Sequence, residues 1–242
     1  MLNFKREKHQ AIVSALHLMD QEFLTSCKCY FGGGTAVVLK YGEYRDSLDI
    51  DFICADIDGY RELRSTAVSR GLSAFFSKPV VALRDFKVDQ YGIRTFIKHN
   101  DLMIKFEIVK EARISVSGTF DTTLGVPILL SEDMFAEKLL ANADRCQDAS
   151  VHYRDAFDLG MLCREFTDIP NASLRKTQTA YGDDIEKKLR WVLDVLSDGT
   201  ERKRAADSLT MRSEDATVAW KALAAAFDRS FGPRPMPPAV GG

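Results

Sequence analysis

The chain has 242 residues, which is enough for one large domain or two smaller ones, each with its own hydrophobic core. Its composition, 45% hydrophobic and 28% charged, is that of an ordinary globular protein. The net charge of -2 excludes a general basic field, so any contact with nucleic acid must come from a local patch.

No apolar run approaches the roughly 20 residues of a membrane helix, and residues 1–8 lack the apolar core of a signal peptide. We therefore expect no membrane partner and a cytoplasmic location. The chain has 5 cysteines, an odd number with no Cys-x-x-Cys pair, and only 4 histidines. We expect the thiols to be reduced, and the pattern predicts no zinc site.

The first predicted element is an amphipathic helix over residues 6–26, whose apolar side chains recur at helical spacing. It leads into a glycine turn, Gly32-Gly33-Gly34, where the backbone can approach a ligand without hindrance from a Cβ atom. Thr35 is predicted to cap a short helix over residues 36–41. A helix N-terminus behind a glycine turn favours phosphate binding, although most glycine turns only reverse the chain.

Residues 48–53 read as a half-buried strand in which Asp49 and Asp51 point to the same face. Two adjacent carboxylates repel each other unless a cation or a shared proton lies between them, so the pair suits a hard divalent metal such as magnesium. The alternative is that this acidic face is simply solvated.

A helix is predicted over residues 60–70, with Gly71 as its stop, and strands over residues 80–83, 94–97 and 102–109. On the last of these strands, Lys105 and Glu107 share the face opposite the apolar residues, which is compatible with a solvent face or with a site. Pro127 is predicted to close the strand-rich region.

The remainder of the chain is predicted to be mainly helical. Ser131 begins a helix that runs over residues 134–144, and residues 171–182 form a polar loop. Residues 232–242, with four prolines, are predicted to be a frayed tail. The other helices are predicted over residues 151–166, 183–196, 201–209 and 213–231.

The pattern Gly33-Gly34-Thr35, then Asp49-x-Asp51, resembles the Gly-Gly-[Ser/Thr]…Asp-x-Asp motif of polymerase-β-like nucleotidyltransferases. A second patch, with Lys138, Arg145 and Arg154-Asp155-x-x-Asp158-Leu159, is similar to a pattern of the AbiEii/AbiGii toxins within that superfamily. The resemblance implies an α+β fold, with a mixed sheet and flanking helices in a catalytic domain over residues 1–127. It further implies a helical bundle over residues 128–242 that closes the active-site cleft.

The resemblance also implies roles for individual residues. Asp49, Asp51 and Glu107 would bind two Mg²⁺ ions, with Glu107 as the third carboxylate. Phosphates of the nucleoside triphosphate would be bound by Gly33, Gly34, Thr35, Lys138 and Arg154. Lys138 and Asp155 would be catalytic, although a lysine and an aspartate on helices are usually surface residues.

We therefore expect an enzyme that transfers a nucleoside monophosphate from a nucleoside triphosphate to an acceptor hydroxyl. The resemblance implies the toxin of a bacterial toxin–antitoxin or phage-defence system, acting on tRNA and restrained by a separately encoded antitoxin, with Lys138, Arg145 and Arg154 as a basic lip for the RNA. Three alternatives stay open: a nucleotidyltransferase with a small-molecule acceptor, a nucleotide-binding regulator without turnover, and an interaction protein with a solvated acidic face.

Overall fold

The computed structural model describes residues 4–233 of the chain. Its internal contacts divide it into two compact units, Met1–Glu137 and Lys138–Gly242, and the boundary falls inside helix α5 (Ser131–Arg145). The fold class is α+β, as predicted, with a mixed sheet in the first unit and helices in the second.

The first unit is built on a mixed sheet of eight strands in the part of the chain that the structure describes. The strand order is β3-β5-β6-β2-β1-β8-β7, and β4 pairs with β5 beside β3. The pairs β2–β6 and β1–β8 are parallel, and the others are antiparallel. The strands are β1 (Cys29–Phe31), β2 (Ile50–Cys54), β3 (Val81–Ala82), β4 (Lys87–Val88), β5 (Gly92–His99), β6 (Leu102–Lys110), β7 (Gly118–Asp121) and β8 (Val126–Leu129).

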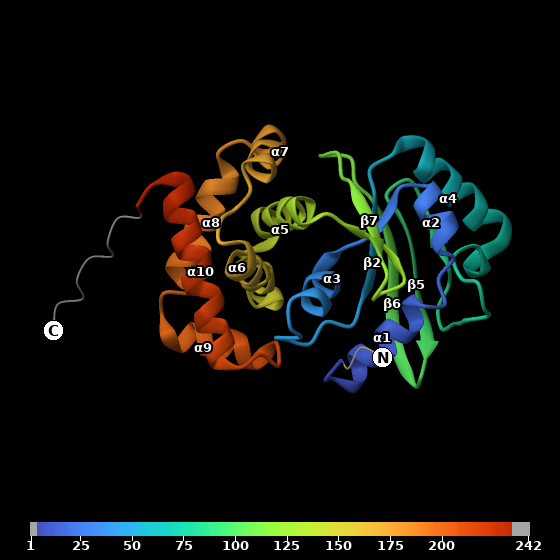
Figure 1. Cartoon of the computed structure of the whole chain (residues 1–242), viewed down its shortest axis with the longest axis horizontal. Coiled ribbons are helices and arrows are strands. Elements are labelled where there is room, and N and C mark those ends of the chain that lie inside the picture. The colour runs from blue at the N-terminus through green and yellow to red at the C-terminus, as the bar shows by residue number, and fades with distance from the viewer. Residues whose placement is uncertain (1–3, 234–242) are drawn as a thin grey trace. The chain divides into compact units, whose positions relative to one another are not determined.

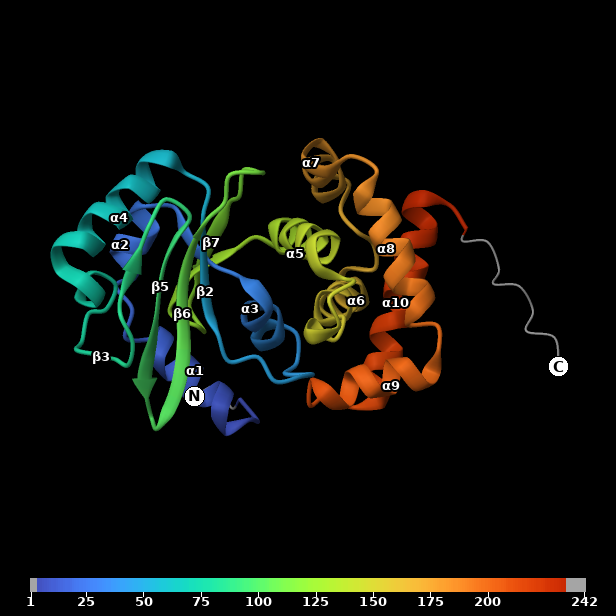
Figure 2. The same ribbon diagram turned by 180° about the vertical axis from the view of Figure 1, so that it is seen from behind.

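Helices cover both faces of this sheet. Figure 1 and Figure 2 show α3 (Gly33–Lys40) on one side of the strands and α2 (Gln21–Ser26) and α4 (Ile57–Arg70) on the other. Phe52 lies at the centre of the core, with ring centroids 5.6 Å from Phe31 and 6.5 Å from Phe106. The remaining helical elements of this unit are α1 (Glu7–Leu16) and the short 3₁₀ helix η1 (Gly71–Ala74).

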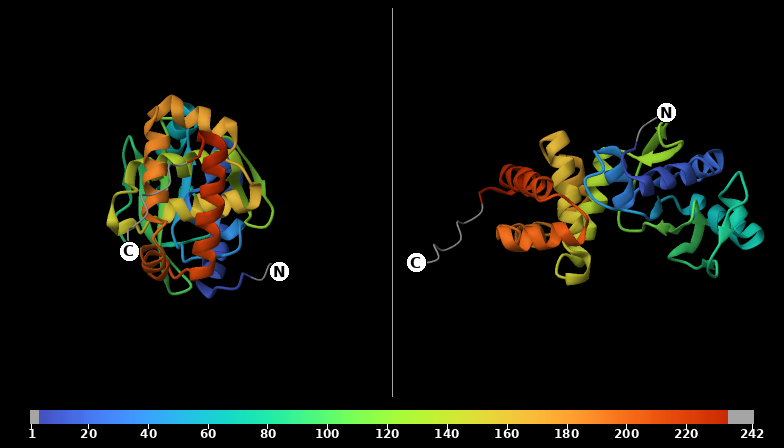
Figure 3. Two further views of the ribbon diagram at one scale, coloured as in Figure 1. Left: turned by 90° about the vertical axis from the view of Figure 1, so that its left-hand side faces the viewer. Right: turned by 90° about the horizontal axis from the view of Figure 1, so that it is seen from below.

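The second unit is helical. After α5 come η2 (Ala149–Val151), α6 (Arg154–Phe166), α7 (Asn171–Tyr181), α8 (Asp184–Val195), α9 (Gly199–Ser208) and α10 (Ser213–Phe231). The left view of Figure 3 shows α8 running beside α10, which also packs closely on α6. Gly160 permits that close packing, because a Cβ atom there would lie 2.2 Å from the carbonyl oxygen of Ala219.

Several predicted elements are confirmed. Asp-x-Asp leads into a strand, α4 ends at Gly71 with a φ of 61°, and α10 spans the predicted residues 213–231. All five cysteines lie among the described residues, where they are buried and form no disulfide. Burial raises the pKa of the Cys54 and Cys163 thiols to about 12, which keeps them protonated.

The single helix predicted over residues 6–26 is wrong, because the chain breaks into α1 and α2. The intervening residues pair with a distant segment, with the amide of Asp20 donating to the carbonyl of Phe75 at 2.9 Å. The Asp20 carboxylate then accepts a bond of 3.0 Å from the amide of Phe23 and caps α2.

The polar loop predicted over residues 171–182 is also wrong, since most of it forms helix α7. This helix buries Ser173, Leu174 and Thr177, so its inner face has little hydrophobic signal. The Thr177 hydroxyl is satisfied inside the helix by the carbonyl of Ser173, 2.9 Å away, which makes its burial inexpensive.

Pro127 does not close the strand-rich region, because it lies inside β8, opposite Phe120 of β7. All four residues of β8 are buried, and a proline removes only one donor from so short a strand. Most of the predicted tail, residues 234–242, lies outside the described residues.

Candidate functional site

The glycine turn lies directly against Asp51, one of the three predicted metal ligands. The amide of Gly32 donates a 2.8 Å hydrogen bond to the carbonyl of Asp51, and Gly33 has a φ of 66°. A Cβ atom on Gly33 would lie 2.6 Å from the Asp51 carboxylate oxygen Oδ2. Only glycine combines this backbone conformation with such a close approach, so the turn and the carboxylate form one local structure.

Thr35 has a different position from the predicted one. Helix α3 begins at Gly33 with Gly32 as its N-cap residue, so Thr35 lies in the first turn and does not cap the helix. Its hydroxyl is fully buried and lies 2.9 Å from the hydroxyl of Ser47, in the loop before β2. Thr35 therefore ties the N-terminal turn of α3 to the segment that carries Asp49.

The sheet register aligns four charged residues across four neighbouring strands. Asp51 of β2 lies opposite Glu107 of β6, Glu107 opposite Arg94 of β5, and Arg94 opposite Lys87 of β4. Residues directly opposite one another point to the same face of a sheet. This charged row, Asp51-Glu107-Arg94-Lys87, therefore has carboxylates at one end and cations at the other.

Lys105 is a residue of this face that the sequence analysis did not single out as functional. Its ammonium is ion-paired with the Glu107 carboxylate, two positions along β6. Burial alone would lower the pKa of Lys105, but the hydrogen bond that Lys105 donates to Glu107 and the charges of Asp51 and Asp49 outweigh burial and raise that pKa. All three predicted metal ligands thus stabilise the Lys105 ammonium. The alternation that puts Lys105 and Glu107 on one face of the strand was the sequence signal that could have identified Lys105.

The predicted ligands fit a divalent cation in their chemistry. Their oxygens are of the type that Mg²⁺ prefers, and together they already stabilise the Lys105 ammonium, which stands in for a metal's charge. Among residues 4–233, however, no three acidic, histidine or cysteine side chains are arranged to hold a metal ion. Glu107 would therefore have to release Lys105 to join Asp49 and Asp51 as a ligand.

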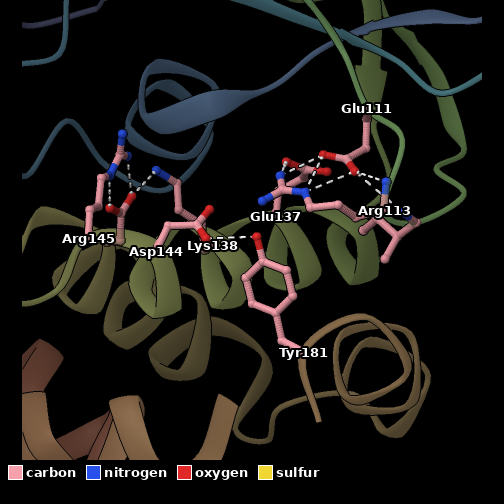
Figure 4. A network of polar contacts seen from close by, with 9 residues as sticks. Glu111, Arg113, Glu137, Lys138, Asp144, Arg145 and Tyr181 are labelled. Atoms are coloured by element: carbon pink, nitrogen blue, oxygen red, sulfur yellow. Dashed lines mark hydrogen bonds and ion pairs between the residues drawn. The ribbon is translucent and has the colours of Figure 1, made fainter. Parts of the chain in front are cut away.

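A second set of predicted residues lies in a buried charge cluster made by Lys138, Arg145, Asp155 and Asp158. The Lys138 ammonium donates to Asp155 at 2.9 Å and lies 2.7 Å from Asp158. Arg145 donates to both oxygens of Asp155, over 2.7 and 2.9 Å. Figure 4 shows Lys138 and Arg145 on α5 with their nitrogens engaged in these contacts.

Opposite charges satisfy one another within this cluster. Burial by itself would raise the pKa of Asp155, but Lys138 and Arg145 outweigh it and hold that pKa well below its usual range. Asp158 was part of the recognised pattern but was not singled out, although its spacing of three residues from Asp155 on a helix placed both on one face. Lys138 and Arg145 are thus held by these carboxylates, and the basic lip that they would form with Arg154 stays a prediction.

The other contacts drawn in Figure 4 reach α5 at Glu137 and at Asp144. Arg113 donates to Glu111 at 2.6 Å and approaches Glu137 at 3.9 Å, and Asp144 accepts a 2.7 Å bond from the Tyr181 hydroxyl. Arg154, predicted to bind phosphate, is the half-buried first residue of α6 and is outside this network.

The fold is similar to that of solved structures of known class. A Helicobacter pylori protein described as a nucleotidyltransferase is similar over 94% of this chain and 97% of its own, with a TM-score of 0.54 and 19% identity. JHP933, also from Helicobacter pylori, is similar over 95% of this chain and 94% of its own, with a TM-score of 0.51 and 19% identity. The fold is thus that of the nucleotidyltransferases, as the sequence resemblance implied.

The family follows from the sequence. A family model described as "Nucleotidyl transferase AbiEii toxin, Type IV TA system" matches residues 17–240, nearly the whole chain. The chain belongs to this AbiEii family of nucleotidyltransferases, which confirms the predicted family. No curated protein matches the chain. None of the helices within residues 4–233 has the length and apolar character needed to cross a membrane.

Proposed function

We propose that the chain transfers a nucleoside monophosphate from a nucleoside triphosphate to an acceptor hydroxyl. The observation that carries this proposal is the contact of Gly33 with Asp51, beside the in-register Glu107. It supports a site in which one element receives phosphates and the next supplies carboxylates, the two parts that phosphoryl transfer needs.

In this proposal the acceptor oxygen attacks the α-phosphorus of the nucleoside triphosphate. One P–O bond forms, the bond to the leaving pyrophosphate breaks, and the hydroxyl proton passes to a carboxylate, for which Glu107 is our candidate. Gly33 and Gly34, at the start of α3, receive the phosphates on their backbone amides, and Thr35 fixes the turn through Ser47.

Asp49, Asp51 and Glu107 are the residues that would hold Mg²⁺, with two ions proposed. When bound, the metal would lower the pKa of the attacking hydroxyl and neutralise charge on the phosphates. The structure supports this assignment through the Lys105 ammonium, which the same three carboxylates already stabilise. Catalytic roles for Lys138 and Asp155, and phosphate binding by Arg154, stay predictions.

The family description supports a biological role as the toxin of a type IV toxin–antitoxin system, which requires an antitoxin as partner. We propose that the acceptor is the 3′ end of tRNA, a flexible single strand with a free hydroxyl.

The purified chain should release pyrophosphate when incubated with one of the four nucleoside triphosphates, Mg²⁺ and total tRNA, and the tRNA should gain nucleotides at its 3′ end. Expression should arrest bacterial growth, and Asp51→Asn should abolish both effects. Pyrophosphate release that needs a small molecule in place of RNA would assign a small-molecule acceptor. Binding of nucleotide with no pyrophosphate release under any condition would assign a regulator and contradict the proposed reaction.

A further inference from the structure

A basic pocket lies on the same sheet face as the candidate carboxylates, toward the cationic end of the charged row. It has a volume of about 440 Å³ and is lined by Arg84, Asp85, Lys87, Arg94, Thr95, Phe96 and Lys105. Four of these seven residues are cationic and one is acidic. In a chain with a net charge of -2, this concentration of positive charge is local.

The cations of the basic pocket are not all neutralised. Arg84 and Lys87 are exposed and make no ion pair with a carboxylate in the part of the chain that the structure describes. Arg94 pairs with Asp89, but its Nε is buried without a hydrogen-bond partner. Such groups favour an anionic ligand, in contrast to Lys138 and Arg145, which are held by carboxylates.

The charged row connects this pocket to the carboxylates. Its members lie on adjacent strands, so Lys87 and Asp51 are separated by three strand spacings, about 14 Å. A chain with regularly spaced phosphates can therefore run along the row, with its phosphates at Lys87 and Arg94 and its end at Glu107 and Asp51. A single compact phosphate would span only part of it.

The geometry of phosphoryl transfer decides which substrate would occupy the pocket. The attacking and leaving oxygens lie on opposite sides of the phosphorus, in line. The glycine turn follows β1, on one side of β2, whereas β6, β5 and β4 carry the pocket on the other side. If the turn binds the phosphates of the nucleotide, in-line attack is compatible with an acceptor that approaches from the side of the pocket.

A planar stacking surface is also present. The guanidinium of Arg84 lies 4.5 Å from the ring centre of Phe96. In single-strand binding sites, bases stack on arginine and aromatic side chains of this kind. The cations would neutralise the backbone while this surface accepts a base.

We propose that the basic pocket binds the phosphate backbone of a single-stranded RNA acceptor and directs its 3′ end toward Glu107 and Asp51. This proposal rests on the proposed function, because the direction of approach is set by transfer from a nucleotide bound at the glycine turn.

The test uses the full chain with Arg84→Glu and Lys87→Glu combined, which reverses two exposed charges. The matched control combines Lys203→Glu and Lys221→Glu, two exposed lysines of α9 and α10 without an ion pair among residues 4–233. The probe is a fluorescein-labelled single-stranded oligoribonucleotide, measured by anisotropy over a salt series. Binding of ATP with Mg²⁺ is measured by calorimetry on the same samples.

We expect the pocket variant to bind the oligoribonucleotide at least about tenfold more weakly, and the slope of log affinity against log salt to fall by about 1.4, for two phosphate contacts. ATP binding should stay within about twofold of the wild type, and the control should bind both ligands normally. Equal weakening in the control, or wild-type RNA binding by the pocket variant, would overturn the proposal.

These outcomes are independent of turnover, so they separate the two proposals. A wild-type chain that extends RNA, with a pocket variant that binds RNA normally, would overturn the pocket while leaving the reaction intact. A wild-type chain that binds no oligoribonucleotide would overturn the pocket as an RNA site even where pyrophosphate is released with a small acceptor.

Discussion

The two units of the chain use buried and half-buried charge in opposite ways. In the first unit, the charged row separates its signs along the sheet, with Asp51 and Glu107 at one end and Arg94 and Lys87 at the other. In the second unit, the buried charge cluster mixes its signs, so that Lys138 and Arg145 alternate with Asp155 and Asp158 over distances of 2.7 to 2.9 Å.

The separation of charges indicates where the protein needs a ligand. Separated charges leave each end with an attraction for something outside the protein, a cation at the carboxylates and an anion at the basic end. In a mixed cluster the charges neutralise one another, so the cluster mainly fixes the arrangement of its helices. Removing one member leaves another buried charge without its partner.

The largest effect should come from removing charge at the acidic end of the row. Asp51→Asn should reduce nucleotidyl transfer by at least about a thousandfold, and Asp49→Asn and Glu107→Gln should behave similarly, because the loss is of charge at the transition state. Thermal unfolding should change little. The control is Asp58→Asn on α4, whose side chain is 85% exposed. Full activity of Glu107→Gln beside two inactive aspartate variants would show that the third carboxylate is misassigned.

The next effect belongs to the buried charge cluster. Lys138→Met should lower the free energy of unfolding by about 3 kcal/mol, because it leaves Asp158 and part of Asp155 buried without their main partner. Urea unfolding measures the change. A stable but inactive Lys138→Met protein would instead support the predicted catalytic role, and the comparison between the two units would then fail.

Gly33→Ala tests the contact between the glycine turn and Asp51. The substitution should cost about 1–2 kcal/mol for its backbone conformation, with a further loss because the added methyl group meets the Asp51 carboxylate. Gly71→Ala is the matched control, since Gly71 has a similar φ of 61° with nothing within 4 Å. We expect Gly71→Ala to lower only the stability. Gly33→Ala should lower both the stability and the affinity for the nucleotide. Equal behaviour of the two variants would remove the evidence for a functional turn.

The smallest effect is a dependence on pH in the buried charge cluster. The pKa of Asp155 is lowered on folding, so its contribution to stability is fully present above the ordinary aspartate value of 3.8 and is lost as the pH falls through the folded pKa. Between pH 5 and pH 3, the wild type should lose about 1 kcal/mol more than Asp155→Asn. Urea unfolding at several pH values measures this difference, and parallel curves for the two proteins would contradict it.

The local parts of this molecule were determined by the sequence. Alternation along residues 48–53 predicted the strand that contains Asp51 and directly follows Asp49. Three successive glycines predicted a turn, because backbone freedom and side-chain period are properties of a few neighbouring residues. The same holds for α10, whose apolar spacing is strong enough to define a helix without help from the fold. Where burial involves hydroxyl groups, as in α7, the hydrophobic pattern is weak and the sequence suggested a loop.

Tertiary structure alone decided which charges meet. The parallel pairing of β2 with β6 sets Asp51 beside Glu107, and the hairpin of β5 and β6 then places Arg94 next to them, although no local pattern links these residues. It also decided that Thr35 packs on Ser47 and that Lys138 is enclosed by two carboxylates. Register and helix packing depend on the whole core, since shifting one strand by a single residue would turn every side chain of the row to the opposite face.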